Sequence, residues 1–332
     1  MAGPRDPAKA TILEDSDRVD RADRSYPSAP PPFPRPMRGG RPHLTGTGSL
    51  WRREPGDNHL SLTSVSSLEQ FVPVRVETRG PVLVVTLDRP AALNAIDPES
   101  HGQLVAAWQR LRDEPELRAG ILTGAGRKAF CAGIDLRRLA DFYAGSYPGE
   151  RRNRWARSPG LGGLTRNFDA GKPVVAAING YCLGLGLELA LACDLRVASP
   201  NATFGLPEVR WGIIPGQGGT QRLPRAVPPS VALEMILLGK PISASRARSI
   251  GLVNRIIPLH RLRSEAYTMA ERIACMPASA VRHAREAIRR GLDLPLALGL
   301  QLEQDLADPL RGSDENKAAI ADFGRKRRRT ID

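Results

Sequence analysis

The sequence predicts an α/β fold with a helical C-terminal region. Short β-branched runs alternate with helical segments between residues 71 and 198, which is typical of layered α/β proteins. Glycines follow the buried strands where helices are expected to begin. From residue 259 to 327 only helices are predicted, three or four in number.

The first elements are predicted to be a hairpin and a helix. The β-branched runs 72–77 and 81–87 flank a glycine-containing turn, which favours a hairpin. Asp97 followed by Pro98 indicates a helix start, because aspartate caps a helix and proline fits its first turn. That helix would place four apolar side chains on one face: Leu104, Val105, Trp108 and Leu111.

The middle of the chain is predicted to hold buried strands and a buried helix. Strands are expected at 119–123, 172–179 and 195–198, and a helix at 186–193. The apolar centre of 172–179 indicates a strand buried on both faces. Two further helices, 230–238 and 243–250, are expected to end at Gly239 and Gly251.

Residues 1–70 are predicted to be a disordered extension. The stretch 26–36 is rich in proline and 60–67 is rich in serine and threonine, so neither can bury much apolar area. A dispensable extension, or a start assigned too far upstream, is one interpretation, and a targeting or interaction role is the other. Neither a signal peptide nor a membrane-spanning run is expected.

The N-terminus, without a signal peptide or an acid-poor transit peptide, predicts a cytoplasmic protein, and the cysteines and histidines predict free thiols and no metal site. Four cysteines in apolar surroundings, none in a C-x-x-C pair, favour buried free thiols over disulfides: Cys131, Cys182, Cys193 and Cys275. The five histidines are scattered and none forms a zinc-ligand motif.

The positive charge belongs to the part of the chain that is predicted to fold. Net charge is +13, and residues 1–70 hold 10 basic and 9 acidic residues. The remaining residues hold 38 basic and 26 acidic residues, a net charge of +12. Such a fold suits an anionic partner, either nucleic acid or a phosphorylated small molecule, and the charge alone does not choose between them.

Three glycine-containing motifs could carry chemistry. In the first, 129–136, Asp135 can cap a short helix whose unpaired N–H groups could stabilise a developing oxyanion. A plain turn from strand to helix is the alternative. In the second, 179–189, Glu188 lies among aliphatic residues, and burial raises the pKa of a carboxyl group. A structural buried ion pair is the alternative there.

The third motif runs from residue 204 to 223. Glu208 follows Pro207 in a short loop, and a glycine run at 216–219 precedes another helix start. Taken alone, Glu208 would be interpreted as a solvated loop acid.

Together the motifs resemble the crotonase superfamily, also called the enoyl-CoA hydratase/isomerase family. The resemblance extends from about residue 72 to 327 and includes the segment 87–95, similar to the family's R-P-x-x-x-N-A signature. It implies a crotonase-type spiral of ββα repeats over 72–257. The helical region 258–332 would form the subunit contacts of a homotrimer or homohexamer.

The resemblance also implies a mechanism. The backbone N–H groups of Ile134 and Leu185 would form an oxyanion hole for the thioester carbonyl. Glu188 and Glu208 would activate water and exchange a proton with the α-carbon, and having both favours an enoyl-CoA hydratase. Water would add reversibly and in syn geometry to a 2-enoyl-CoA, giving a 3-hydroxyacyl-CoA. Many members have glycine where this chain has Leu185, so the leucine side chain is expected to reshape the acyl pocket.

Coenzyme A enters as part of the substrate, so the resemblance implies no separate cofactor. Substrate or CoA contacts are expected at seven positions: Arg89, Ala132, Asp135, Arg137, Gly184, Phe323 and Lys326. Ala91 stands where the family often has lysine, so one phosphate contact is expected to be missing. The acyl pocket is expected to involve the loop 139–163, with Phe142, Tyr143, Tyr147 and Trp155, together with Trp211.

Other readings are weaker. The segment 124–129 fits G-x-G-x-x-A, but the long helix and second acidic strand of a dinucleotide fold do not follow it. The basic run 325–329 permits RNA binding but lacks interleaved aromatic residues. An isomerase, a racemase-type dehydratase or a hydrolase on the same scaffold is the enzymatic alternative.

Overall fold

The computed structural model describes residues 72–143 and 157–329, with side chains described up to residue 323. The predicted disordered extension, residues 1–70, lies outside this range.

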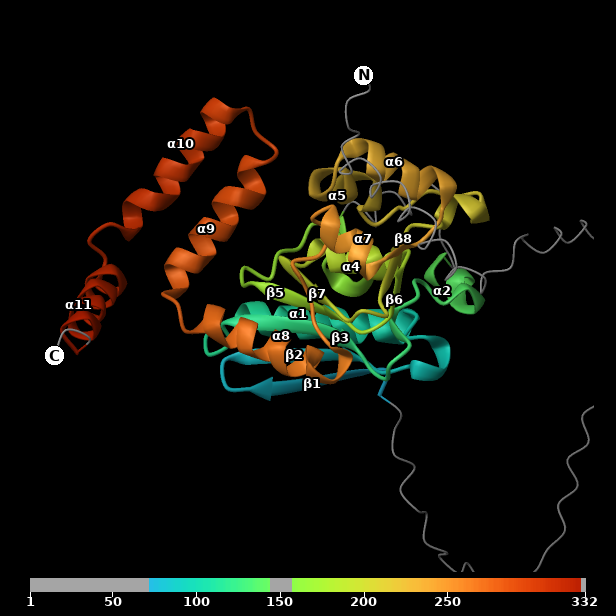
Figure 1. Cartoon of the computed structure of the whole chain (residues 1–332), viewed down its shortest axis with the longest axis horizontal. Helices are drawn as coiled ribbons and strands as arrows, with labels where there is room; N and C mark the ends of the chain where they lie inside the picture. Colours follow the sequence, from blue (N-terminus) through green and yellow to red (C-terminus); the bar gives the residue numbers. More distant parts are fainter. Residues whose placement is uncertain (1–71, 144–156, 330–332) are drawn as a thin grey trace, which may run out of the picture. The chain divides into compact units, whose positions relative to one another are not determined.

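A six-stranded sheet forms the centre of the fold (Figure 1). Its strand order is β1-β2-β3-β5-β7-β10. β1 and β2 pair in antiparallel fashion as the predicted hairpin, and the other neighbours are parallel. The strands are β1 (Val74–Arg79), β2 (Val82–Leu87), β3 (Ala119–Gly124), β5 (Val174–Ile178), β7 (Leu195–Ala198) and β10 (Arg255–Ile256). All residues of β2, β3 and β5 are buried, which confirms strands covered on both faces.

A second sheet of four short strands has the order β4-β6-β8-β9. The strands are β4 (Ala129–Cys131), β6 (Tyr181–Leu183), β8 (Thr203–Gly205) and β9 (Ile242–Ser243). Each of β3, β5 and β7 in the first sheet is followed along the chain by β4, β6 or β8 in the second. This repetition of a long strand and a short strand is the ββ part of the expected ββα repeat.

Two helices cover opposite faces of the larger sheet (Figure 1). Alternate residues of β2 divide between two core clusters, as a pleated strand requires. One cluster packs β2 against α1 (Pro98–Asp113) and the buried helix α4 (Leu185–Ala192). The other packs it against α8 (Leu259–Ala274). The expected C-terminal helical region therefore begins with a helix that belongs to the core rather than to a separate layer.

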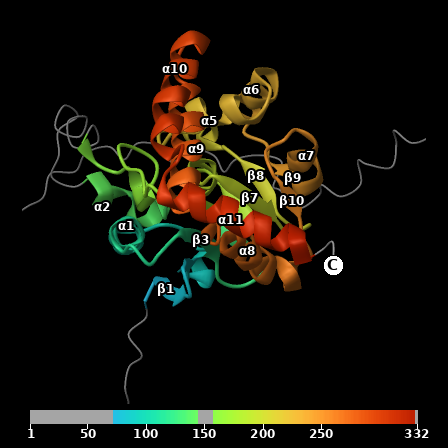
Figure 2. The same ribbon diagram turned by 90° about the vertical axis from the view of Figure 1, so that its left-hand side faces the viewer.

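The remaining helices surround the second sheet or extend from the core. The first group is α2 (Leu139–Tyr143), α5 (Gly219–Ala226), α6 (Pro229–Leu238) and α7 (Ala244–Ser249). The second group is α9 (Ala278–Gly291), α10 (Leu296–Ala307) and α11 (Asp314–Arg329). With α8 they make four C-terminal helices, within the predicted three or four. Figure 1 shows that α9, α10 and α11 extend away from the two sheets, and in Figure 2 these helices face the viewer.

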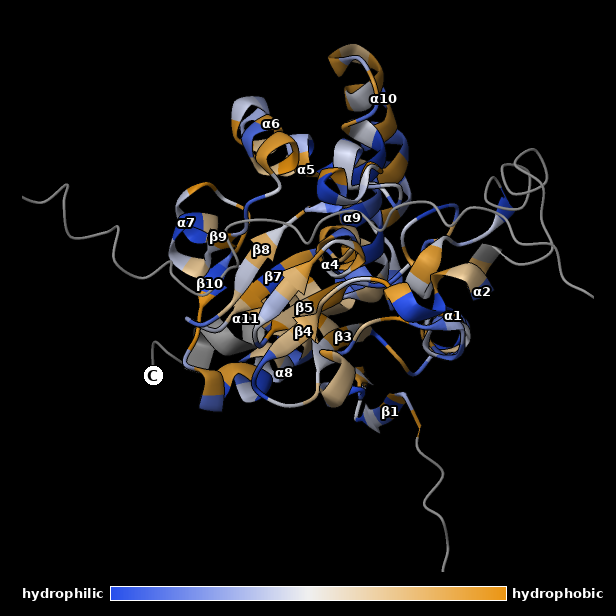
Figure 3. Cartoon of the chain, turned by 90° about the vertical axis from the view of Figure 1, so that its right-hand side faces the viewer, coloured by the Kyte–Doolittle hydropathy of each residue, from blue (hydrophilic) through white to orange (hydrophobic). Residues whose placement is uncertain are grey.

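The α9–α10 pair carries an exposed apolar surface. Arg285 of α9 ties the pair to the core through Asp169 and Asp194, at 2.7 and 2.8 Å. Figure 3 shows apolar residues along α10, where three leucines are more than half exposed: Leu296, Leu298 and Leu300.

The cysteine prediction is confirmed in part. All four cysteines are free, and Cys131, Cys182 and Cys193 are buried. Cys275 is exposed, contrary to the prediction, because it lies just past the end of α8. Among the residues that the structure describes, no helix is long and apolar enough to span a membrane. Over the same residues, three or more metal-ligating side chains nowhere gather into a possible ion site.

Candidate active site

The first two glycine-containing motifs lie next to each other because β4 and β6 are neighbouring parallel strands. The turns that follow these strands leave the same edge of the sheet. A Cβ atom added to Gly133 would lie 3.8 Å from the amide nitrogen of Leu185. One added to Gly184 would lie 3.8 Å from the Cα atom of Gly133. The two turns are therefore in van der Waals contact, and both glycines have positive φ.

The N–H group of Ile134 points away from the segment that precedes α1. The amide of Ile96 donates to the carbonyl of Gly133, and the amide of Asp135 donates to the carbonyl of Ile96, both at 2.9 Å. The Gly133 carbonyl and the Ile134 N–H belong to one trans peptide and point in opposite directions. The N–H of Ile134 finds no acceptor within the described parts of the chain.

The N–H group of Leu185 also has no acceptor among the residues that the structure describes. Leu185 is the first residue of α4, where backbone N–H groups lack partners within the helix. The Gly184 carbonyl in the same peptide accepts the first helical hydrogen bond, from the amide of Glu188 at 3.0 Å. The Leu185 side chain is only 2% exposed and packs in the main core cluster. Its expected effect on the acyl pocket stays a prediction.

Glu188 lies one helical turn after Leu185 and is 2% exposed. Its Oε1 accepts hydrogen bonds from the amides of Gln217 and Gly219, at 2.6 and 2.9 Å. Burial raises the pKa of Glu188, and the two amides and the nearby Arg222 partly oppose that rise. Its hydrogen-bond partners in the described chain are backbone amides. These amides, rather than a structural ion pair, hold the carboxyl group in place.

Glu208 is half-buried at the start of a short 3-10 helix, Glu208–Trp211. Its Oε2 is buried, and no residue in the described part of the chain hydrogen-bonds to it. Its Oε1 lies 3.2 Å from the position that a Cβ atom on Gly184 would occupy. Burial raises the pKa of Glu208 to about 7, with a smaller contribution from the charge of Glu188. Glu208 is therefore not a solvated loop acid: it is half-buried beside Gly184 and electrostatically coupled to Glu188.

The raised pKa of Glu208 predicts a pH-dependent stability cost. The pKa rises from 4.5 to about 7, so the folded protein retains a proton that the unfolded chain has lost. The free energy of unfolding should therefore fall as pH rises between these values. Glu208→Gln should remove this loss and stabilise the protein by about 1–3 kcal/mol more at pH 8 than at pH 5.

Denaturant unfolding of both proteins at the two pH values measures this difference. The exposed Glu234→Gln on α6 is the matched control and should behave alike at both. The same stabilisation by Glu208→Gln at pH 5 and pH 8 would contradict the prediction.

The residues expected to contact CoA fall into two groups. Arg89 and Asp135 are 15% and 5% exposed at their side chains and are paired with each other at 3.0 Å. The guanidinium of Arg89 donates to partners inside the fold, and its expected contact with CoA stays a prediction. Arg137 is 79% exposed at its side chain and Phe323 is 67% exposed, so both are accessible.

The structure describes only some of the other residues that were expected to contact the substrate. Ala132 and Gly184 lie in the two adjacent turns. The side chain of Lys326, the aromatic residues Tyr147 and Trp155, and the side chain of Tyr143 lie outside what the structure describes. Two expected pocket aromatics are described: Phe142 lies beside His101, with ring centroids 6.3 Å apart, and Trp211 is 61% exposed.

One part of the site was missed in the sequence. The glycine run at 216–219 predicted only a helix start, yet its amides hold the Glu188 carboxyl group. The side chain of Gln217 also accepts hydrogen bonds from the amide of Leu161 and the hydroxyl of Thr165, both at 3.0 Å. A buried carboxyl group needs hydrogen-bond donors, and only this requirement of Glu188 could have indicated that nearby backbone amides bind it.

Known proteins share both the sequence and the fold of this chain. The family model described as enoyl-CoA hydratase/isomerase matches residues 77–330. The (E)-benzylidenesuccinyl-CoA hydratase of Thauera aromatica is 39% identical over 259 residues, covering 77% of this chain and 97% of that protein. The carnitinyl-CoA dehydratase of Proteus mirabilis is 41% identical over 229 residues, covering 69% of this chain and 85% of that protein.

Solved structures of enoyl-CoA hydratases have a similar fold. The enoyl-CoA hydratase of Bacillus anthracis is 36% identical with a TM-score of 0.69, covering 76% of this chain and 96% of that one. An enoyl-CoA hydratase of Mycobacterium marinum is 34% identical with a TM-score of 0.70, covering 77% and 97%. The chain therefore belongs to the enoyl-CoA hydratase/isomerase family and is an enzyme with the crotonase fold.

Proposed function

We propose that this enzyme adds water reversibly to the double bond of a 2-enoyl-CoA thioester, giving a 3-hydroxyacyl-CoA. The observation that carries the proposal is the placement of two carboxyl groups with raised pKa values, Glu188 and Glu208, around one pair of turns. The same turns present the N–H groups of Ile134 and Leu185, for which residues 72–143 and 157–329 offer no acceptor.

The two N–H groups would receive the thioester carbonyl oxygen. Attack of water at C3 moves the electron pair of the double bond through C2 onto that oxygen, which becomes an enolate. Fixed backbone donors stabilise such a charge without reorganising during the reaction. The carbonyl then re-forms as C2 takes up a proton.

The two glutamates would divide the proton transfers. Two amides fix the Oε1 atom of Glu188, which leaves its other oxygen to orient water and accept a proton from it. Glu208 has a pKa of about 7 and a buried oxygen without a partner in the described chain. It is therefore suited to donate the proton that C2 takes up. Each hydration would thus move one proton from water to Glu188 and one from Glu208 to C2. Proton exchange with solvent would then return Glu188 to its carboxylate and Glu208 to its protonated form before the next turnover.

A panel of CoA thioesters tests the proposal and defines the acyl group. The relatives are named as a hydratase of (E)-benzylidenesuccinyl-CoA and a dehydratase of carnitinyl-CoA, two directions of one reaction type. The panel therefore includes these two, crotonyl-CoA and longer 2-enoyl-CoA thioesters. We expect at least one of these thioesters to gain or lose water. The absorbance of the conjugated thioester measures the reaction. Migration of a double bond without any water addition across the panel would contradict the proposal.

The wider surface would serve CoA and other subunits. The exposed Arg137 and Phe323 are proposed to approach the CoA moiety, and the net charge of the folded part suits its phosphates. CoA is part of the substrate in this scheme, and no separate cofactor is required.

The exposed leucines of α10 are proposed to form subunit contacts in a homotrimer or homohexamer. The cytoplasmic location predicted from the N-terminus belongs to the same proposal.

A further inference from the structure

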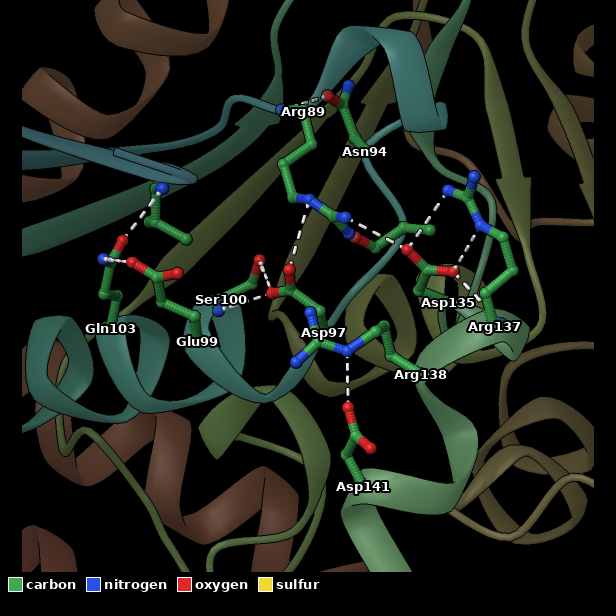
Figure 4. Close-up of polar contacts among 12 residues, drawn as sticks. Arg89, Asn94, Asp97, Glu99, Ser100, Gln103, Asp135, Arg137, Arg138 and Asp141 are labelled. Atoms are coloured by element: carbon green, nitrogen blue, oxygen red, sulfur yellow. Dashed lines mark hydrogen bonds and ion pairs between the residues drawn. The ribbon is translucent and has the colours of Figure 1, made fainter. Parts of the chain in front are cut away.

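One arginine joins the caps of two helices beside the proposed oxyanion hole (Figure 4). Nε of Arg89 lies 3.3 Å from Oδ2 of Asp97, which caps α1. One terminal nitrogen donates to the carbonyl of Ala95 at 2.6 Å, and the other donates to Oδ2 of Asp135 at 3.0 Å. Asp135 in turn caps the short helix Leu136–Arg138. One planar guanidinium thus fixes three points of the chain.

These contacts surround the peptide that presents the Ile134 N–H group. Asp135 is the next residue after Ile134, and Ala95 precedes Ile96, which pairs with Ile134 in an isolated parallel bridge. The Arg89 guanidinium therefore ties both sides of this bridge together. The bridge turns the Gly133 carbonyl toward Ile96, so it also decides where the Ile134 N–H points.

A second residue anchors the same segment. Asn94 is 1% exposed and has positive φ. Its amide nitrogen donates to the carbonyls of Ala125 and Ala129, and its oxygen accepts from the amide of Arg89. Arg89 therefore extends from a segment whose backbone is itself held against the turn before β4.

The charges make Arg89 hard to replace. The side chains of Asp97 and Asp135 are 9% and 5% exposed, and that of Arg89 is 15% exposed. Without this cation, Asp97 would lose its ion-pair partner in the described chain, and Asp135 would keep only Arg137, whose side chain is 79% exposed. A lysine would keep the charge but has a single ammonium group, which cannot match the fork geometry of a guanidinium.

We propose that Arg89 is a positioning residue that holds the Ile134 N–H group in line with the Leu185 N–H group. The inference rests on the proposed function, because it assumes that these two donors polarise the thioester carbonyl. Arg89 acts in this scheme through the segment 95–97 and through Asp135, without touching the substrate.

Arg89→Lys in the full chain tests this role, with Arg110→Lys as the matched control. Arg110 also makes a forked pair, with Glu114 at 2.7 and 3.2 Å, but in the last turn of α1, where its side chain is 39% exposed. Arg89→Lys should lower kcat for hydration at least roughly tenfold and change KM little, because an electrostatic contribution made mainly in the transition state is weakened. Arg110→Lys should match the unaltered enzyme.

A spectroscopic readout separates positioning from a general structural role. The unaltered enzyme should lower the infrared carbonyl frequency of bound butyryl-CoA labelled with ¹³C at the thioester carbon. Arg89→Lys should lose most of that shift while circular dichroism stays unchanged. If Arg89→Lys fails to fold, Asp135→Asn serves instead, since it keeps the shape and removes one charged partner. It should reduce the shift in the same way.

The outcomes separate this inference from the proposed function. An active hydratase whose Arg89→Lys or Asp135→Asn variant keeps full kcat and the full carbonyl shift would overturn the role of Arg89 alone. Carbonyl polarisation that is lost in Arg89→Lys, in an enzyme that hydrates none of the thioesters, would support the role of Arg89 and overturn the proposed function.

Discussion

Glu188→Gln and Glu208→Gln are each expected to slow hydration by at least roughly 10²-fold, the low end of general acid–base contributions. Glutamine keeps the shape of either side chain and removes the group that gains or loses a proton. Adding water to a 2-enoyl thioester needs a base for the water and an acid for C2. Neither carboxyl group can perform both transfers at once, so each single change should disable the reaction. Steady-state kinetics with the best thioester of the panel measures the effect.

The double variant should be far less than additively worse, because groups that act as a unit are lost together. Binding of the CoA thioester should weaken little, since both carboxyl groups are assigned to chemistry rather than to CoA. Glu234→Gln, on the exposed surface of α6, controls for an amide substitution remote from the site. Full hydration by the Glu208→Gln enzyme would rule out its role as the acid.

Ile134→Pro is expected to reduce kcat by about 10²–10³-fold, the effect typical of removing one oxyanion donor. Proline has no N–H group, whereas Ile134→Ala keeps the donor and shortens a half-buried side chain. The alanine variant should therefore be nearly as active as the unaltered enzyme. Initial rates at saturating thioester compare the two substitutions.

Proline also restricts the residue before it, so the turn at Gly133 could be disturbed independently of the lost donor. Leu136→Pro controls for this, because Leu136 is the first residue of a 3-10 helix, where proline is tolerated. Circular dichroism should show all three variants folded. Equal losses in Ile134→Ala and Ile134→Pro would mean that the side chain, not the donor, matters.

The main sheet and its helices could be predicted because their patterns are long enough to be distinctive. The strand β5 is apolar throughout and β2 is apolar except for Thr86. The helix α1 begins at an aspartate and a proline that the structure confirms as its cap and first turn. The second sheet could not be predicted, because strands of two or three residues are too short to show alternation. Their pairing depends on contacts between distant segments.

The sequence allowed the candidate residues of the site to be identified, but not how they are arranged or what they contact. Glu188 stood out because a carboxylate among aliphatic residues needs an explanation, and the structure buries it. Glu208 alone resembled a solvated loop acid, because its burial comes from contacts that the local sequence does not contain. For Arg89 the resemblance implies a contact with CoA, which stays a prediction. No local pattern indicates its ion pairs, because Asp97 and Asp135 lie 8 and 46 residues away.

Hydration in ¹⁸O-labelled water tests the central claim most directly. The enzyme is given 2-enoyl-CoA and 3-enoyl-CoA thioesters separately, and the products are analysed by mass spectrometry. We predict that the 2-enoyl thioester yields a 3-hydroxyacyl-CoA carrying one ¹⁸O atom, and that Glu188→Gln and Glu208→Gln abolish this incorporation. Rapid migration of the double bond with negligible label in any hydroxyacyl product would contradict the account.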